Sequence, residues 1–296
     1  MDRKRIIDPK FEIQNIVDSI KKYFVANGNE NTKAVIGISG GKDSTVAAAL
    51  LVRALGANRV VGVMMPQGYQ GDLDDARKVC EVLGIQNFVI NIGPVCGELF
   101  KVFTGNTELP LNNQINTNAP ARIRMNILYM VAAALGGRVI NTGNASELYV
   151  GYTTKYGDLA GDYAIFKDYY VREVIEIGKE LRELPIELVV KDPADGMSGK
   201  TDEDNLGFTY KVLDKYLIDG VMPEYDVYRA IQTRYRNNQH KRCIDLPHPR
   251  AKTRHWEDEE IDYEISMISK SITIQGNNDV LAYVKRILLT NGFEIL

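Results

Sequence analysis

Cysteines are scarce in this 296-residue chain: Cys80, Cys96 and Cys243 stand far apart, and none forms a Cys-x-x-Cys pair. This scarcity excludes a disulfide framework and a cysteine-based zinc site. No apolar run approaches the roughly 20 residues that span a bilayer. The basic opening at residues 1–5 leads into an amphipathic segment of mixed charge, with no apolar signal core. We therefore expect a cytoplasmic protein without a membrane partner.

The chain also has no excess of positively charged residues. Lys and Arg number 36 against 39 Asp and Glu, which gives a net charge of -3. Proteins that grip nucleic acid through its phosphates usually carry a clear excess of Lys and Arg, so we expect no nucleic-acid partner. The chain has 45% hydrophobic and 25% charged residues, with no internal repeat and no break in composition. This composition predicts a single domain over residues 1–296.

A glycine-rich loop joins a strand to a helix near the N-terminus. Residues 34–38 form an apolar run typical of a parallel sheet, and residues 44–55 have the pattern of a helix that ends before Gly56. Adjacent glycines let several N–H groups converge on an anion at the positive end of a helix. Ser39 and Ser44 add hydroxyl donors, so the segment predicts a phosphate site and points to ATP.

The loop is not a Walker A motif. That motif needs a glycine, four residues and then Gly-Lys-Ser/Thr, but Ile36 stands at the first glycine position and Asp43 follows Lys42. A carboxylate in a phosphate cradle repels the ligand unless a divalent cation lies between them, so Asp43 is a candidate magnesium ligand. The string Ser-Gly-Gly-Lys-Asp-Ser instead resembles the PP-loop (residues 37–44) of ATP pyrophosphatases, which cleave ATP between its α- and β-phosphates and adenylate a substrate.

Strand and helix patterns alternate over the first part of the chain. Apolar periodicity predicts strands at 34–38, 59–65, 87–91 and 138–141, and helices at 9–25, 44–55, 73–83, 120–135 and 171–184. Pro120 suits the first turn of its helix. The alternation predicts an α/β fold with a doubly wound parallel sheet and flanking helices.

The other segments are less regular. Residues 143–167 carry tyrosines and glycines without a clear period, which indicates an irregular functional loop. The polar, turn-rich residues 191–207 indicate a mobile loop. Short helices are expected at 213–218 and 227–235, within a helical C-terminal extension over about 211–296.

Several polar segments follow the loop along the chain, and their order is informative. They are Asn-Ala-Pro-Ala-Arg-Ile-Arg-Met at 118–125, Thr-Gly-Asn-Ala-Ser-Glu at 142–147, Thr-Lys-Tyr-Gly-Asp at 154–158, Asp162, Thr-Asp-Glu-Asp-Asn-Leu-Gly-Phe-Thr-Tyr at 201–210 and His-Lys-Arg at 240–242. Together they closely resemble the ammonia-dependent NAD synthetases over nearly the whole chain. The resemblance implies a Rossmann-like, adenine nucleotide alpha-hydrolase-like fold, and a homodimer with active sites near the subunit interface. It also implies a ligase that uses ATP to adenylate the nicotinate carboxylate of deamido-NAD, releases pyrophosphate, and lets ammonia displace AMP to form the amide of NAD.

On the ATP side, the resemblance implies that residues 37–44, Gln70 and Thr142 contact the nucleotide, and that Asp43 and Glu147 bind Mg²⁺. A cation there would neutralise the charge that develops on the leaving pyrophosphate. Thr142 follows a strand, so its hydroxyl can reach the crevice at the carboxyl ends of the parallel strands. The alternatives are a simple turn residue for Thr142 and a surface glutamine for Gln70.

On the deamido-NAD side, the resemblance implies contacts from Arg122, Lys155, Asp162, His240 and Lys241. The substrate carries a pyrophosphate and a carboxylate, which two or three cations can hold. Asp43, Lys155 and Asp162 are the expected catalytic residues. Asp162 is the candidate that takes a proton from ammonium or from the attacking amine, because only neutral ammonia is nucleophilic. The alternatives are a helix-surface arginine for Arg122 and a structural histidine for His240.

Two positions depart from the family pattern. Val171 stands where the family usually has a lysine that contacts ATP, with Lys167 and Arg172 nearby. Ala194 falls where the family has a Thr or Ser hydroxyl. Both departures concern ATP affinity more than the type of reaction.

Other functions stay open at this point. Two are different PP-loop enzymes, GMP synthetase-like or tRNA-thiolating, although thiolation enzymes usually carry paired cysteines and a basic RNA-binding surface. The third is a non-catalytic nucleotide-binding module, against which the presence of both Asp43 and Glu147 argues. The chain has no room for a glutaminase domain and no cysteine in an amidotransferase-like context, so free ammonia is the expected nitrogen source.

Overall fold

The structure, a computed structural model, describes residues 7–68, 72–191 and 202–242, with the backbone of three short strands between 267 and 295. By its contacts the chain separates into two compact units, Met1–Ile244 and Asp245–Leu296. The sequence predicted one domain because no change of composition marks this boundary.

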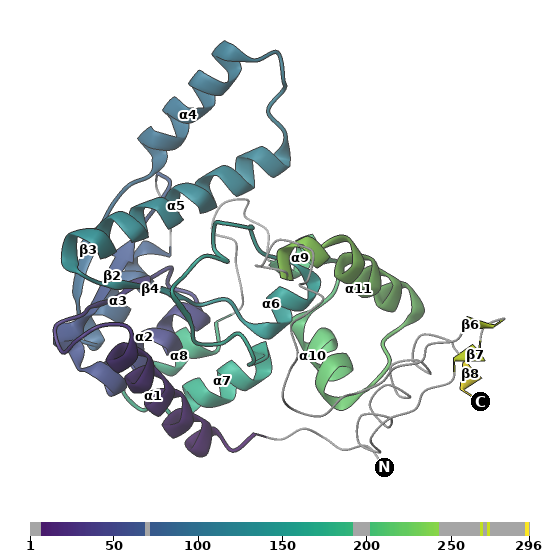
Figure 1. Ribbon diagram of the computed structural model, residues 1–296, viewed down its shortest axis with the longest axis horizontal. Helices are drawn as coiled ribbons and strands as arrows, with labels where there is room; N and C mark the ends of the chain where they lie inside the picture. Colours follow the sequence, from purple (N-terminus) through teal and green to yellow (C-terminus); the bar gives the residue numbers. More distant parts are fainter. Residues whose placement is uncertain are drawn as a thin grey trace, which may run out of the picture. The chain divides into compact units, whose positions relative to one another are not determined.

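The first unit is built on a five-stranded parallel sheet in the order β3-β2-β1-β4-β5 (Figure 1). Its strands are β1 Ala34–Gly37, β2 Val60–Met64, β3 Gln86–Val89, β4 Arg138–Asn141 and β5 Tyr163–Ala164. The chain runs outward from β1 to β3 on one side and then from β4 to β5 on the other. The order of strands therefore reverses between β1 and β4, and ligands of such sheets bind outside the carboxyl ends of the strands at this point.

Helices cover both faces of the sheet (Figure 1). One face packs against α1 Pro9–Ala26, α2 Lys42–Leu55, α3 Leu73–Val82, α7 Val171–Lys179 and α8 Ile186–Val189, with a short 3-10 turn, η1 Ala57–Arg59, between α2 and β2. The other face packs against α5 Asn113–Leu135, and α4 Gly93–Asn106 lies against α5. None of the helices within the described ranges is long and apolar enough to cross a membrane.

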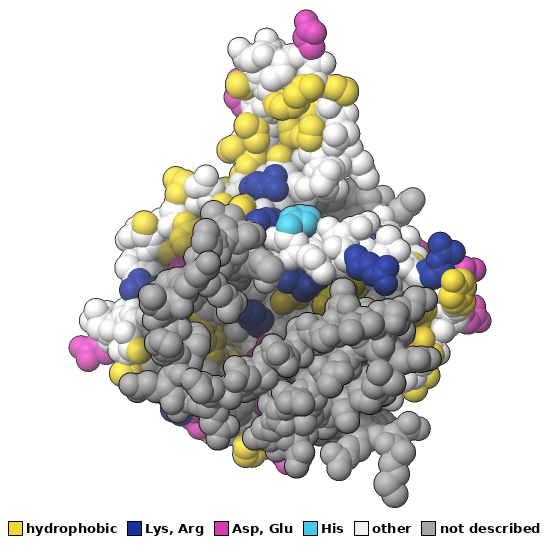
Figure 2. Space-filling model, turned by 45° about the vertical axis from the view of Figure 1, so that its right-hand side comes forward, with side chains coloured by type: hydrophobic (Ala, Val, Ile, Leu, Met, Phe, Trp, Pro, Cys, Tyr) yellow, Lys and Arg dark blue, Asp and Glu magenta, His cyan; other side chains and the backbone are white. Residues whose placement is uncertain are grey.

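α4 leaves apolar side chains uncovered within the described chain. Val95, Leu99 and Val102 recur at helical spacing along it and are 51%, 45% and 53% exposed. Figure 2 shows hydrophobic side chains gathered on this projecting part of the first unit, at the top of the view.

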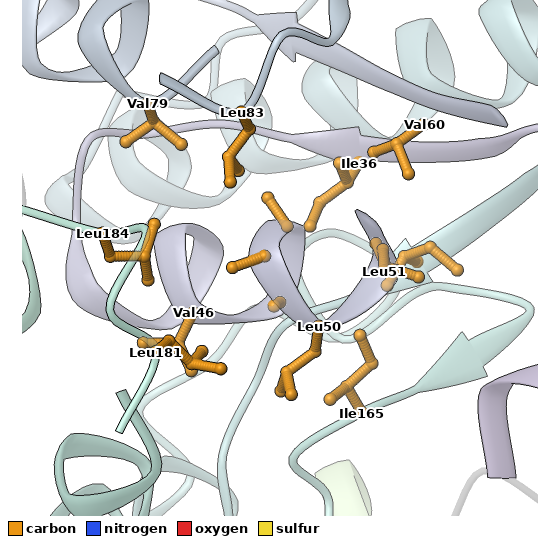
Figure 3. Close-up of a cluster of buried hydrophobic side chains, with 14 of the residues drawn as sticks. Ile36, Val46, Leu50, Leu51, Val60, Val79, Leu83, Ile165, Leu181 and Leu184 are labelled. Atoms are coloured by element: carbon orange, nitrogen blue, oxygen red, sulfur yellow. The ribbon is translucent and has the colours of Figure 1, made fainter. Parts of the chain in front are cut away.

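Alternation along the strands builds two separate cores. Ala34 and Ile36 of β1 face α2, whereas Val35 between them faces α5. Figure 3 shows the first core, where Leu50 and Leu51 of α2 lie among side chains from the strands and from the segment after α7. α2 is buried along most of its length because α1, α7 and α8 also pack on it. This packing fixes the start of α2, which follows the glycine-rich loop.

A smaller helical group completes the first unit. It consists of α6 Ala145–Val150, α9 Asp202–Leu206, α10 Tyr210–Asp219, α11 Tyr225–Asn237 and α12 Gln239–Arg242, around an apolar cluster of its own. The buried Asp214 carboxylate on α10 ties this group to α7: it accepts hydrogen bonds from Ser146 Oγ of α6 at 2.6 Å and from Arg172 N of α7 at 2.7 Å. α6 is thereby held at the carboxyl edge of the sheet.

The second unit has few described residues. They form β6 Met267–Ile268, β7 Ser271–Ile272 and β8 Glu294–Ile295, with β6 antiparallel and β8 parallel to β7. The expected C-terminal extension is therefore helical over 210–242, and the described residues beyond 242 are strands. Each strand contains an isoleucine, whose β-branched side chain favours extended backbone.

The α/β prediction is confirmed, and the elements expected before residue 92 lie within two residues of their predicted bounds. Other predicted bounds were wrong. α5 begins at Asn113, because the Asn112 side chain caps it by accepting from Ile115 N at 2.9 Å, and Pro120 lies inside the helix. α7 ends at Lys179, turns follow over residues 180–184, and Pro185 disfavours helix at Leu184, where the predicted helix ended.

Three segments are more regular than expected. The mobile loop predicted over 191–207 includes α9, and its residues 192–201 lie outside the described residues. The sequence predicted no helix between β3 and α5, but α4 fills this segment. The expected irregular loop over 143–167 contains α6 and the edge strand β5. The sequence did not predict α6, because a helix of six residues is too short to show a repeat of apolar side chains.

Candidate functional site

A cavity of about 1130 Å³ opens at the carboxyl edge of the sheet. Its walls come from the segments after β1, β2 and β4, from α5, and from the helical group of the first unit. The predicted site residues that line it are Gly37, Ile38, Ser39, Gly41, Lys42, Asp43, Ser44, Thr142, Glu147 and Lys241. The fold thus brings residues from distant parts of the sequence into one cavity.

The glycine-rich loop runs from the end of β1 into α2, whose N-cap is Gly41. Hydroxyl groups fix its shape: Ser44 Oγ accepts from Ser39 N at 3.3 Å, and Thr45 Oγ1 donates to Gly41 O at 2.8 Å. The first turn of α2 borders the cavity, and the first N–H groups of a helix have no partner within the helix. This arrangement suits an anionic ligand such as a phosphate.

Gly40 is the position where the loop requires glycine. Its φ is +79°, and a Cβ atom there would lie only 2.6 Å from the backbone oxygen of Asp72. The loop can therefore pack directly on the start of α3. Gly40 is not among the residues that line the cavity, so its role is to allow the loop conformation and not to contact a ligand in the cavity.

Lys42 brings a buried positive charge to the cavity. Its side chain is only 4% exposed, and its Nζ lies 3.1 Å from Asp43 Oδ2 and 5.8 Å from the centre of the Tyr210 ring. These contacts hold the ammonium beside the loop. A phosphate on the loop would lie close to this charge.

Asp43 and Glu147 form a carboxylate pair on opposite sides of the strand-order reversal, since one follows β1 and the other follows β4. Asn144 connects them: its Nδ2 donates to Asp43 Oδ1 at 3.2 Å, and its backbone N donates to Glu147 Oε2 at 3.1 Å. Burial, and then the negative charge of Asp43, raise the pKa of Glu147 to about 8, although Lys42 acts in the opposite direction. The two carboxylates therefore resist ionising together.

A divalent cation would relieve this repulsion, and the donor set fits Mg²⁺. Mg²⁺ is usually held by one or two carboxylates together with substrate phosphates. Within the described ranges, no group of three or more His, Cys, Asp or Glu side chains could hold a metal ion by itself. A cation between Asp43 and Glu147 would therefore need phosphate oxygens as further ligands.

Asn144 is a site residue that the sequence did not single out. It is 1% exposed and caps α6 by accepting from Glu147 N at 3.0 Å, while Glu147 completes the capping box. Its contact with Asp43 joins residues 101 positions apart in the sequence. The one available signal was its place between Thr142 and Glu147.

Lys241 lines the cavity from α12, close to the end of the first unit. Its Nζ donates to Gly151 O and to Thr153 O, both at 2.7 Å. Burial lowers the pKa of Lys241, against the opposing effect of the Asp158 carboxylate. Asp158 also lines the cavity, and its Oδ1 accepts from Thr154 N at 2.5 Å. Lys241 and Asp158 thus form a second charged region in the cavity.

The other predicted substrate residues do not line the cavity. Arg122 and His240 are exposed, and Arg122 Nε donates to Lys155 O at 3.2 Å. The Lys155 ammonium lies 5.1 Å from the centre of the Tyr156 ring. Gln70 falls outside the described residues.

The carboxylate of Asp162 forms hydrogen bonds at the edge of the sheet. Its Oδ2 accepts from Val139 N at 2.7 Å and its Oδ1 from Tyr129 Oη at 3.3 Å, so the carboxylate fastens the start of β5 to β4. Asp162 itself is exposed and does not line the cavity. The carboxylate that the fold brings into the cavity on this side is Asp158.

The structure describes one of the two positions that depart from the family pattern, Val171, and the basic residues near it. Val171 is buried at the start of α7, and Arg172 pairs with Asp219 at 2.7 Å, away from the residues that line the cavity. Lys167 is exposed, and Ala194 falls outside the described residues. Lys191 does line the cavity, where it pairs with side chains at the start of α3, Asp72 at 2.5 Å and Asp75 at 2.7 Å.

A doubly wound parallel sheet that carries a Ser-Gly-Gly-Lys-Asp-Ser loop at the reversal of strand order defines a nucleotide-binding protein of the adenine nucleotide alpha-hydrolase-like class. The chain belongs to the NAD synthase family, whose model matches residues 12–245.

The similar proteins agree with this assignment. The chain is 42% identical over 214 residues to the NH(3)-dependent NAD(+) synthetase of Pyrococcus horikoshii, which covers 72% of this chain and 79% of that protein. It resembles the solved structure of NMN synthetase from Francisella tularensis with a TM-score of 0.75 and 33% identity, over 82% of this chain and 99% of that chain. It also resembles the NH3-dependent NAD synthetase of Campylobacter jejuni in complex with nitrate, with a TM-score of 0.64 and 27% identity, over 83% and 100% of the two chains.

Proposed function

We propose that this chain catalyses the ATP-dependent amidation of deamido-NAD to NAD with ammonia, through an adenylated intermediate, with release of pyrophosphate and AMP. The observation that carries this proposal is the linked pair Asp43 and Glu147 beside the glycine-rich loop, within a cavity lined by further charged groups. The experiment that tests it supplies ATP, deamido-NAD and ammonium and looks for AMP and NAD. A non-catalytic module would bind ATP and form neither product.

The loop and Lys42 would bind the phosphates of ATP, and Asp43 and Glu147 would hold Mg²⁺ against them. Bound there, Mg²⁺ would supply positive charge to the pyrophosphate as it leaves. The N–H groups at the start of α2 and the Lys42 ammonium act in the same direction, because they are fixed before the reaction and need no rearrangement. Asn144 holds the two carboxylates in place. Thr142 lines the cavity beside them and would contact the nucleotide.

Lys241 and Asp158 would serve the deamido-NAD half of the reaction. The ammonium of Lys241 suits a carboxylate or a pyrophosphate oxygen of the substrate. Asp158 lies in the cavity and would take the proton from the attacking amine, the role that the sequence gave to Asp162. Arg122, Lys155, Asp162 and His240 remain proposed substrate residues on the strength of the resemblance alone.

A second candidate substrate is nicotinate mononucleotide, which the same chemistry would convert to nicotinamide mononucleotide. The likeness to NMN synthetase from Francisella tularensis, with its TM-score of 0.75, favours including it. Competition between equal concentrations of the dinucleotide and the mononucleotide, with the products separated by mass, decides between them. We expect NAD to be the main product.

We also propose that the protein works in the cytoplasm as a homodimer that uses α4 as part of its interface. Cys80 and Cys96 are free thiols, as a reducing compartment allows. The exposed apolar side chains of α4 suit an interface with a second copy (Figure 2). α4 packs on α5, and α5 lines the cavity, so a partner on α4 would lie next to an active site.

The change Leu99→Glu tests this interface. A charge in an apolar interface has to lose water without a partner, so the variant is expected to be monomeric where the wild type is dimeric. Light scattering behind size exclusion should give the wild type twice the 33.2 kDa chain mass and the variant one chain mass. Val25→Glu, at an 82% exposed apolar side chain on α1, serves as the control and should stay dimeric. A monomeric wild type, or a dimeric Leu99→Glu, would contradict the proposal.

A further inference from the structure

α5 presents two arginines to different surroundings. Arg122 and Arg124 are two positions apart, which places them about 200° apart around a helix. Arg122 is exposed and bonds to Lys155 O. Arg124 is partly buried and lines the cavity. The sequence pattern had favoured Arg122, but Arg124 is the arginine of this segment that the fold turns toward the site.

The guanidinium of Arg124 is held by one hydrogen bond. Its Nε donates to Met65 O at 3.1 Å, just beyond the end of β2, and the described chain offers its two terminal NH₂ groups no further hydrogen-bond acceptor. No ion pair among the described residues includes it. A guanidinium carries five N–H donors, and a charge removed from water is costly unless it is paired.

The surroundings of Arg124 explain why an anion belongs there. Burial lowers the pKa of Arg124, and the opposing effects of Cys96 and Asp158 are smaller. One turn further along α5, the side chain of Leu128 lies close to Gly37, where a Cβ would be 3.7 Å from Leu128 Cδ1. Arg124 therefore flanks the glycine-rich loop on the β2 side, while Glu147 flanks it on the β4 side. The Asp158 carboxylate acts on both Arg124 and Lys241, so these two cations face the same region of the cavity.

We propose that Arg124 is a binding residue for a phosphate group of a nucleotide, which it holds with its two NH₂ groups while Nε stays on Met65. A planar guanidinium matches two oxygens of one phosphate, and such paired contacts are stronger than single ones. The phosphate could come from ATP or from the pyrophosphate of the dinucleotide. The inference rests on the proposed function, since that function brings both nucleotides to this cavity.

Calorimetric titration of Arg124→Gln with Mg·ATP, with inorganic pyrophosphate and with deamido-NAD tests the proposal. We expect at least one of the two nucleotides to bind ten- to a hundredfold more weakly, with a matching rise in its Michaelis constant. Loss confined to ATP assigns the phosphate to ATP, and loss confined to deamido-NAD assigns it to the dinucleotide. Arg124→Lys keeps the charge but not the paired contact, and should recover only part of the affinity.

The control is Arg77→Gln on the surface of α3, which removes the same charge from a pair with Asp74 and should leave binding unchanged. If folded Arg124→Gln binds both nucleotides and pyrophosphate within twofold of the wild type, the inference is wrong. A lower melting temperature with unchanged binding would also contradict it, because Arg124 would then be structural. The proposed function fails separately, when the wild type forms neither AMP nor NAD, and the ATP titration still tests the subsite in that case.

Discussion

Replacing Asp43 with asparagine is expected to lower the turnover number by about 10²- to 10³-fold or more, which is the typical loss when one fixed charge-stabilising group is removed from an active site. Asparagine keeps the size of the side chain and loses the charge. The cation that neutralises the leaving pyrophosphate would lose one of its two protein ligands. Turnover measured across a magnesium series should show both the lower rate and a higher magnesium requirement.

The same change should leave the melting temperature nearly unaltered. Asp43→Asn removes the attraction to Lys42 at 3.1 Å, which destabilises, and it removes the repulsion with Glu147, which stabilises. These two effects have opposite signs. Asp74→Asn is the control, because the Asp74 side chain is 88% exposed and pairs with the surface residue Arg77. Near-normal turnover of Asp43→Asn with an unchanged magnesium requirement would remove Asp43 from the proposed metal site.

Lys241→Ala is expected to raise the Michaelis constant for deamido-NAD roughly ten- to a hundredfold, as the loss of a charge-assisted contact of about 1.5 to 3 kcal/mol implies. The Michaelis constant for ATP should change little. The structure adds a second effect, since Lys241 Nζ also donates to Gly151 O and Thr153 O and so holds the segment after α6. Steady-state kinetics with each substrate varied in turn measure both constants.

Lys211→Ala, at an exposed lysine on α10, is the matched control and should alter neither Michaelis constant. A Lys241→Ala variant that loses affinity for ATP and keeps it for deamido-NAD would show that the two ligands have been assigned to the wrong halves of the cavity.

The scaffold and the loop could be predicted because local rules determine them. An apolar run, a glycine pair and a helix pattern follow one another at 34–55, and the structure has β1, the loop and α2 in that order. Repetition of the strand–helix unit then leaves few possible arrangements of a parallel sheet. α4 was missed because its sequence contains Gly93, Pro94, Gly97 and Gly105, and because its apolar side chains are exposed and not directed into a core.

The site was only partly predictable, for a different reason. Residue types and their order indicated which segments meet, but not which side chain of a segment enters the cavity. Arg124 lines it and Arg122 does not, because the packing of α5 on the sheet sets the rotation of the helix. Asp158 enters it and Asp162 binds to β4, a choice made by hydrogen bonds along the sheet edge. The contact of Asn144 with Asp43 depends on the meeting of two loops far apart in the sequence.

The central claim is that this chain makes NAD from deamido-NAD with ATP and ammonia. The most direct measurement incubates the purified chain with deamido-NAD, ATP, Mg²⁺ and ammonium at mildly alkaline pH, where more of the ammonium is neutral ammonia, and follows NAD and AMP by chromatography. We expect NAD and AMP in equal amounts, no product without Mg²⁺, and little product when glutamine replaces ammonium. Absence of both NAD and AMP with ammonium present would contradict the claim.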